Sequence, residues 1–316
     1  MKKIVYLLSA IAAGFSSSAL ADISVSGTGH FGYVSGDSDQ RVAGSGGVKF
    51  ALSTTTANGT TITSAGGITS DLEGTAASGV SGLSSLTFAT GGATIVLGND
   101  VAVPQNGGFG SVASDLADVG HQSIDASPAV GTDADQDGSG VSFSSAFGTS
   151  TVTAVYVWDD TLVDADGQGN PDSGTQSYGL GISMPMGAAT LVASYGVSQD
   201  SSTENDTLAG IGATFAAGPG TLSVGYQQST GGVDGTAISS KFSMSLDADT
   251  TAAIGVKQAD EGSANASTTE AKITRAIGGG ASVYAELKSS SGNATGVGAA
   301  TADAASTFAI GTNVAF

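Results

Sequence analysis

Acidic side chains gather in one long segment, residues 100–138, between two predicted strands. Its acids are Asp100, Asp115, Asp118, Asp125, Asp133, Asp135 and Asp137. The segment contains no lysine or arginine. Because carboxylates that line a water-filled passage favour cations, Asp115, Asp118 and Asp125 near its middle are candidates for a constriction. The alternative is that these acids only solvate a surface loop, as charge runs often do.

Few basic side chains are available to face these acids. Alternation along the predicted strands puts His30, Arg41 and Lys49 on the polar faces of the first two strands. Lys241 and Lys257 lie on the same kind of face further along the chain. Acids on one side of a passage and bases on the other create a transverse field that orients polar solutes. We therefore predict Arg41 and Lys49 at the constriction, and His30, Lys241 and Lys257 facing the lumen.

Three aspartates alternate in "DADQDG", residues 133–138. Asp133, Asp135 and Asp137 resemble the first half of a calcium-binding loop. The twelfth position of such a loop holds a bidentate glutamate, whereas this chain has Ser144 there. A calcium ion on the three aspartates would therefore need carbonyls or a neighbouring loop as further ligands. No pattern in the chain requires a cofactor.

The residue types needed for catalysis are scarce. The chain has two histidines, His30 and His121, and neither has a cysteine or histidine neighbour at metal-ligand spacing. The stretch "GTGHFG" (27–32) matches G-x-G-x-x-G, but no predicted helix follows it to hold a phosphate. We therefore predict that the protein is not an enzyme.

The N-terminus has the features of a secretory signal peptide. Lys2 and Lys3 precede an apolar run, and the small residues Ala-Leu-Ala lie immediately before residue 22. We predict a cleaved signal over 1–21 and a mature domain over 22–316. The chain contains no cysteine, so a disulfide framework is excluded in spite of export.

The chain is strongly acidic, with 9 Lys+Arg against 28 Asp+Glu and a formal net charge of −19. Two of the basic residues lie in the signal and every acid follows it, so the mature chain carries −21. Nucleic-acid binding needs a basic surface, so we predict that nucleic acid is not a partner. The 49 glycines disfavour helices, and an apolar content of 40 % in regular alternation argues against disorder.

Apolar residues alternate with small or polar ones in short bursts, which is the period of a strand with one apolar face. In one burst Tyr178, Leu180, Ile182 and Met184 alternate with glycine and serine. Sixteen such segments lie near 22–34, 41–54, 60–70, 83–90, 93–99, 139–148, 149–158, 175–185, 188–199, 206–217, 219–229, 236–246, 250–259, 268–277, 280–290 and 304–316. An all-β fold follows.

Short and long connections alternate between these strands. The tight turns are "GG" at 91–92, "MG" at 186–187, "DAD" at 247–249 and "GG" at 278–279. The longer polar segments are 71–82, 159–174, 260–267 and 291–303. An even number of strands of about ten residues, with short turns at one end, is typical of outer-membrane β-barrels. We predict a 16-stranded antiparallel transmembrane β-barrel in the cell outer membrane.

The last strand supports a closed barrel. Phe308, Ile310, Thr312, Val314 and Phe316 alternate with small or polar residues to the end of the sequence. In hydrocarbon every backbone polar group must be paired within the protein, so the last strand should pair with the first. Its apolar face would then contact outer-membrane lipid, and the acidic outer loops could be bridged by divalent ions to lipopolysaccharide.

Arg275 conflicts with this pattern. Its parity with Ile273 and Ile277 places it on the lipid face, where a charge costs about 2–4 kcal/mol at mid-depth. An interfacial position, a subunit interface or a β-bulge would each remove the conflict.

In layout, the whole mature chain resembles the general porins of Gram-negative bacteria, of the alphaproteobacterial kind. The resemblance is sharpest over 97–124, where "SDLADVG" (114–120) is similar to the family's passage into the third loop. It implies a homotrimer, passive diffusion of small hydrophilic solutes and ions, and a segment 100–138 folded inward. It also implies that Phe316 is recognised by the barrel-assembly machinery. The excess of acids predicts a preference for cations.

Two other functions fit part of the pattern. A secreted or surface-exposed adhesin built as a β-helix would also be acidic and cysteine-free, although the chain has no fixed short repeat. A barrel enzyme such as a surface protease or lipase would need a catalytic group at the rim, with only His30 or His121 to serve it.

Overall fold

The computed structural model describes residues 22–36, 40–71, 79–81, 85–98, 139–158, 176–199, 206–231, 234–261, 264–292 and 305–315. No helix within these ranges is long and apolar enough to cross a membrane. The described residues form one sheet in which every pairing is antiparallel.

The described part of the chain contains seventeen strands. The first nine are β1 (Asp22–Gly36), β2 (Gln40–Thr55), β3 (Thr61–Asp71), β4 (Gly79–Ser81), β5 (Ser85–Thr90), β6 (Ala93–Gly98), β7 (Ser139–Phe147), β8 (Ser150–Trp158) and β9 (Gln176–Met186). The other eight are β10 (Ala189–Gln199), β11 (Asp206–Ala217), β12 (Gly220–Thr230), β13 (Gly235–Ser245), β14 (Thr250–Asp260), β15 (Asn265–Gly278), β16 (Ala281–Gly292) and β17 (Ala305–Ala315).

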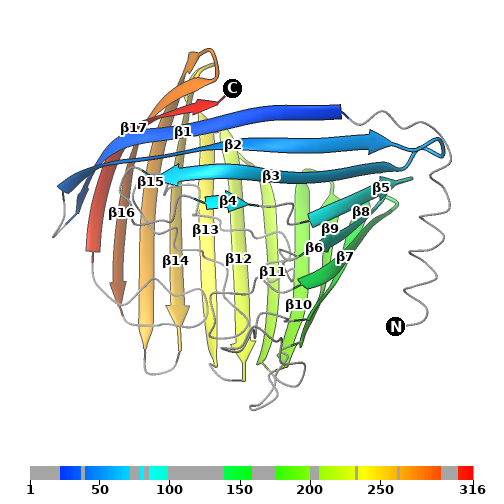
Figure 1. Cartoon of the computed structure of the whole chain (residues 1–316). Coiled ribbons are helices and arrows are strands. Elements are labelled where there is room, and N and C mark those ends of the chain that lie inside the picture. The colour runs from blue at the N-terminus through cyan, green and yellow to red at the C-terminus, as the bar shows by residue number, and fades with distance from the viewer. Residues whose placement is uncertain are drawn as a thin grey trace, which may run out of the picture.

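These strands make a closed barrel with sixteen positions around its circumference. Both β4 and β5 pair with β3, at successive positions along it, so together they fill one position. The barrel closes where β1 pairs with β17, with Gly32 opposite Gly311 at the centre of the seam. Figure 1 shows β1 beside β17 at this seam. The predicted 16-stranded antiparallel barrel is confirmed, and a β-helix, which would need parallel pairing, is excluded.

Two predicted connections are wrong. The predicted connection 71–82 contains the short strand β4, which pairs with β3. The sequence pattern predicts a loop over 260–267, whereas β15 begins at Asn265 and the backbone N–H of Glu261 donates to the carbonyl of Ala264 at 2.8 Å. The first residues of β15 are polar, so the apolar alternation does not mark them. Their side chains contact β16 through hydroxyl groups: Oγ of Ser267 lies 2.8 Å from Oγ of Ser291 on β16.

Large apolar side chains cover the outside of the barrel. Ile254, Ile273, Leu287 and Ile310 lie on four neighbouring strands, β14 to β17, and each is 44–52 % exposed. Alanine, glycine, threonine and charged residues alternate with them on the inner face. The exposed aromatic residues include Phe50, Tyr33, Tyr156, Tyr178, Tyr195 and Tyr226. Exposed apolar and aromatic side chains on the outside are what a lipid-embedded barrel needs.

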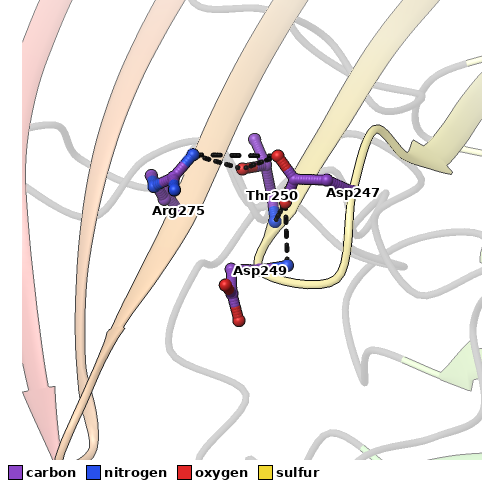
Figure 2. Close-up of polar contacts among 4 residues, drawn as sticks. All are labelled: Asp247, Asp249, Thr250 and Arg275. Carbon is purple, nitrogen blue, oxygen red and sulfur yellow. Dashed lines mark hydrogen bonds and ion pairs between the residues drawn. The ribbon is translucent and has the colours of Figure 1, made fainter.

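The turn between β13 and β14 is held by the carboxylate of Asp247 (Figure 2). Its Oδ1 accepts the backbone N–H groups of Asp249 and Thr250, each at 2.8 Å, and its Oδ2 accepts the Thr250 hydroxyl at 3.0 Å. Nη1 of Arg275 lies 3.7 Å from the same Oδ2. The register of β15 against β16 shifts between Ala276 and Gly278. Arg275 pairs with Val283 before this shift and keeps its outward direction, so its place beside the turn near the end of β15, and not the β-bulge, removes the conflict noted in the sequence.

This turn makes stability depend on pH. The N–H of Asp249 and the Thr250 hydroxyl, more than Arg275, hold the pKa of the Asp247 carboxyl below its ordinary range. A lowered pKa stabilises the fold fully above the unfolded-state value of about 4, and this contribution is lost as the pH falls through the lower folded-state value. We expect Asp247→Asn to lower the melting temperature at neutral pH, and the difference from wild type to close below about pH 4. Thermal unfolding at both pH values checks this, and a difference that does not change with pH would contradict it.

Candidate functional site

The inner face of β13 to β16 carries six charged side chains, which we call the wall cluster. Its members are Lys241, Lys257, Glu270, Lys272, Glu286 and Lys288. They occupy the strand positions that alternate with exposed residues such as Val256 and Leu287. Four lysines and two glutamates give the wall cluster a formal charge of +2 in a chain whose net charge is −19. The wall cluster is therefore a local reversal of the chain's overall sign.

Four members of the wall cluster form two pairs of opposite charge between β15 and β16. Glu270 lies directly opposite Lys288, and Lys272 lies directly opposite Glu286. The closest nitrogen and oxygen atoms are 3.8 Å apart in both pairs. Charges therefore alternate along each strand as well as between β15 and β16. Both glutamates are only 4 % exposed, and carboxylates so far removed from water need cationic partners to remain charged.

The two predicted lysines complete the wall cluster around Glu270. The register places Gly255 between Lys241 and Glu270, and glycine leaves room for the lysine side chain to cross β14. Lys257 is buried and lies opposite Thr268, two residues before Glu270. Lys241, Lys257 and Lys288 all interact electrostatically with the Glu270 carboxylate. Lys288 is thus paired with the Glu270 carboxylate, and Lys241 and Lys257 lie within electrostatic range of it.

An aromatic side chain joins the wall cluster to the barrel seam. Tyr284 is only 3 % exposed, and its ring lies 5.1 Å from Nζ of Lys272. A Cβ atom placed on Gly311, directly opposite, would lie 2.7 Å from the Tyr284 hydroxyl oxygen. The ring therefore covers the backbone of Gly311, and glycine is needed there because any side chain would displace the ring. The cation–π contact holds the Lys272 ammonium group against the wall.

The predicted residues near the N-terminus lie apart from the wall cluster along the chain. On β1, Nδ1 of His30 lies 2.8 Å from Oδ1 of Asn313 on β17, across the closing seam. Lys49 on β2 is exposed and lies opposite Ser26. For Arg41 the structure describes the backbone, which pairs with Val34. The constriction role assigned to Arg41 and Lys49 stays a prediction, as does the lumen role of His30.

The remaining predicted residues lie outside the part of the chain that the structure describes. They are the constriction candidates Asp115, Asp118 and Asp125, the calcium candidates Asp133, Asp135 and Asp137, and the assembly signal Phe316. The predicted signal 1–21 and the predicted constriction loop 100–138 lie outside it as well. Within the described ranges, no group of three or more His, Cys, Asp or Glu side chains could hold a metal ion.

Sequence reasoning missed four members of the wall cluster and Tyr284. The alternation of charged and apolar residues could have identified them. Glu270 and Lys272 alternate with Ala271 and Ile273, just as Lys257 alternates with its apolar neighbours. The same parity rule, applied to β16, identifies Tyr284, Glu286 and Lys288. What parity does not provide is the pairing, because register between strands depends on residues far apart in the sequence.

Comparison with known proteins gives one family and several solved structures. The family model described as "Gram-negative porin" matches residues 8–306. The comparison with curated protein sequences found no match.

The solved structures resemble the chain in fold. A structure titled anion-selective porin from Comamonas acidovorans has a TM-score of 0.69 at 14 % identity, and the alignment covers 94 % of this chain and 100 % of that one. A double mutant of the porin of Rhodopseudomonas blastica has a TM-score of 0.67 at 17 % identity, covering 93 % and 100 % of the two chains. Identities this low establish a shared barrel, and the selectivity named for the first protein describes that protein.

Proposed function

The chain belongs to the Gram-negative porin family and lies in the outer membrane, and we propose that it forms a water-filled channel for passive diffusion of small hydrophilic solutes and ions. The observation that carries this proposal is the two-faced barrel. Exposed apolar residues such as Ile254 and Leu287 suit contact with lipid, whereas the charged wall cluster lies on the inside. A charged inner wall suits water and polar solutes.

We also propose that the channel prefers cations. The support is the charge balance of the mature chain, −21, since the summed potential of a protein sets the local concentration of mobile ions. The wall cluster, at +2, acts in the opposite direction over β13 to β16. Most of the acidic excess lies elsewhere in the chain. We therefore expect the wall cluster to reduce the preference for cations without reversing it.

The experiment is the reversal potential of the refolded mature protein in a planar bilayer under a gradient of potassium chloride. We expect discrete conductance steps and a reversal potential on the potassium side. Lower selectivity at high salt should follow, because screening shortens the range of the acids to about 3 Å at 1 M. Reversal on the chloride side would contradict the cation preference, and inserted protein without steps would contradict the channel.

The same recording tests the proposed assembly. A homotrimer should give conductance steps that appear in groups of three, whereas single independent steps would contradict it. We further propose that the protein catalyses no reaction and binds no obligatory cofactor. Contact with lipopolysaccharide and recognition of Phe316 by the barrel-assembly machinery complete the proposal. The first rests on the acidic outer loops, which divalent ions could bridge to lipopolysaccharide, and the second rests on the resemblance to general porins. Unchanged insertion into outer membranes after deletion of Phe316 would contradict its recognition by the barrel-assembly machinery.

A further inference from the structure

Arg275 is a cation on the outer, apolar face of the barrel. It lies on β15 between Ile273 and Ile277, which are 44 % and 59 % exposed. Leu246, in the turn that Arg275 contacts, is exposed as well. Short turns mark the periplasmic end of an outer-membrane barrel, so Arg275 lies at the edge of the periplasmic leaflet. At that depth a charged side chain is tolerated, because it costs only about 0–1 kcal/mol.

The contacts of Arg275 use one side of its guanidinium group. Nη1 donates to Oγ1 of Thr250 at 3.3 Å and lies 3.7 Å from Oδ2 of Asp247 (Figure 2). Within the described residues, Nε and Nη2 have no partner. The side chain is 58 % exposed. Since Asp247 already accepts three hydrogen bonds from its own turn, the ion pair orients the guanidinium group and leaves its other donors open.

The groups around Arg275 match the order of groups in a phospholipid. Aliphatic side chains flank it on the outer face of β15, as acyl chains lie beside a lipid phosphate. Asp249 is at the tip of the turn, its carboxylate points away from Arg275 in Figure 2, and that carboxylate has no partner among the described residues. In a zwitterionic phospholipid the ammonium group lies beyond the phosphate. The Asp249 carboxylate lies beyond the Arg275 guanidinium group in the same order, so it suits that ammonium group. Two acids beside one arginine disfavour a headgroup with net negative charge.

We propose that Arg275 and the turn 246–250 bind the headgroup of a zwitterionic phospholipid, with a phosphate on Nε and Nη2 of Arg275 and an ammonium group near Asp249. A guanidinium group presents two parallel N–H donors that match two phosphate oxygens. The inference goes beyond the channel function and depends only on the outer-membrane location. It also provides a ligand for Arg275, the charged residue that the sequence pattern places on the apolar outer face.

The test is native mass spectrometry of the refolded mature protein in detergent, titrated with phosphatidylethanolamine. We expect one lipid molecule per chain to bind about tenfold more weakly to Arg275→Gln than to wild type, since a charge-assisted hydrogen-bond pair of this kind is worth about 1.4 kcal/mol or more. The matched control is Lys49→Gln, which removes one positive charge from β2 and leaves Arg275 and the turn 246–250 unchanged. It should retain the lipid, whereas a nonspecific effect of the lost charge would make both variants behave alike.

Three further probes separate the lipid from other ligands. Diacylglycerol, which lacks the phosphate, should bind equally to wild type and Arg275→Gln, and a difference would assign the effect to the acyl chains. Inorganic phosphate should not displace the lipid, and displacement would overturn the lipid proposal in favour of a simple anion site. Equal binding of phosphatidylethanolamine to both proteins, or a change of oligomeric state in Arg275→Gln, would overturn it as well. The second outcome would place Arg275 at a subunit contact.

Discussion

Replacing Glu270 by glutamine should lower the free energy of unfolding by about 3 kcal/mol. Glu270 is 4 % exposed and lies 3.8 Å from Lys288, with Lys241 and Lys257 also within electrostatic range. The substitution leaves Lys288 without its paired carboxylate and removes the negative charge that attracts Lys241 and Lys257. Removing one partner of a buried pair costs more than the pair contributes. Chemical denaturation of the refolded barrel in detergent measures the change.

The same substitution should move the reversal potential toward chloride. The wall cluster would change from +2 to +3, and fixed charge on a channel wall favours ions of the opposite sign. A double variant, Glu270→Gln with Lys288→Gln, restores the formal charge and should recover selectivity together with about 1 kcal/mol or more of stability.

The matched control for this prediction is Asp249→Asn, which removes one negative charge from an exposed turn. Its carboxylate has no partner among the described residues, so we expect stability to stay within about 0.5 kcal/mol of wild type. If Glu270→Gln were equally mild, the wall cluster would be hydrated and its charges independent. If Glu270→Gln left the reversal potential unchanged, the charges of the wall cluster would not act on the permeating ions.

The barrel itself could be predicted from local sequence, because its two faces meet different solvents. Lipid outside and polar side chains inside force a period of two on every strand, and this period is visible within five or six residues. It identifies β9 and β10 to within one residue of their ends. The rule fails where a strand leaves the lipid: the polar start of β15, at Asn265, has no apolar face to mark it.

The site could be predicted only in part, because its geometry depends on register. Parity assigns Lys241 and Lys257 to the inner face, but nothing near them in the sequence shows that Glu270 lies between Gly255 and Lys288. The partner of Arg275 is similarly distant: Asp247 comes 28 residues earlier and reaches it across one strand pairing. Alternation finds the face on which a charge lies, and only the pairing of strands finds its partner.

The seam between β1 and β17 should tolerate no side chain at Gly311, and Gly311→Ala should lower the free energy of unfolding by about 2–3 kcal/mol. An added Cβ would lie 2.7 Å from the Tyr284 hydroxyl oxygen and 2.8 Å from the backbone oxygen of Phe31. Either the buried ring or the backbone of β1 must move. Moving the ring also separates it from Nζ of Lys272, which lies 5.1 Å from its centre.

The same strand pair offers a matched control. Gly29 on β1 lies opposite Val314, and an added Cβ there meets nothing within 4 Å. Gly29→Ala should therefore leave stability unchanged or raise it by up to about 1 kcal/mol, since alanine loses less backbone entropy than glycine on folding. Chemical denaturation of the two variants gives the comparison. Gly311→Ala as stable as Gly29→Ala would mean that the Tyr284 ring can leave the wall without cost.

A third variant separates the two obstacles at Gly311. In a Tyr284→Ala background the ring is absent and the backbone of β1 remains, so the added cost of Gly311→Ala should fall by about 1 kcal/mol or more. A ring pushed off the wall would enter the lumen, so Gly311→Ala with Tyr284 present should also reduce single-channel conductance. Lost stability with unchanged conductance would instead place the strain in the pairing of β1 with β17. The seam would then be the weaker element, and the wall that carries Lys272 and Glu286 would remain intact.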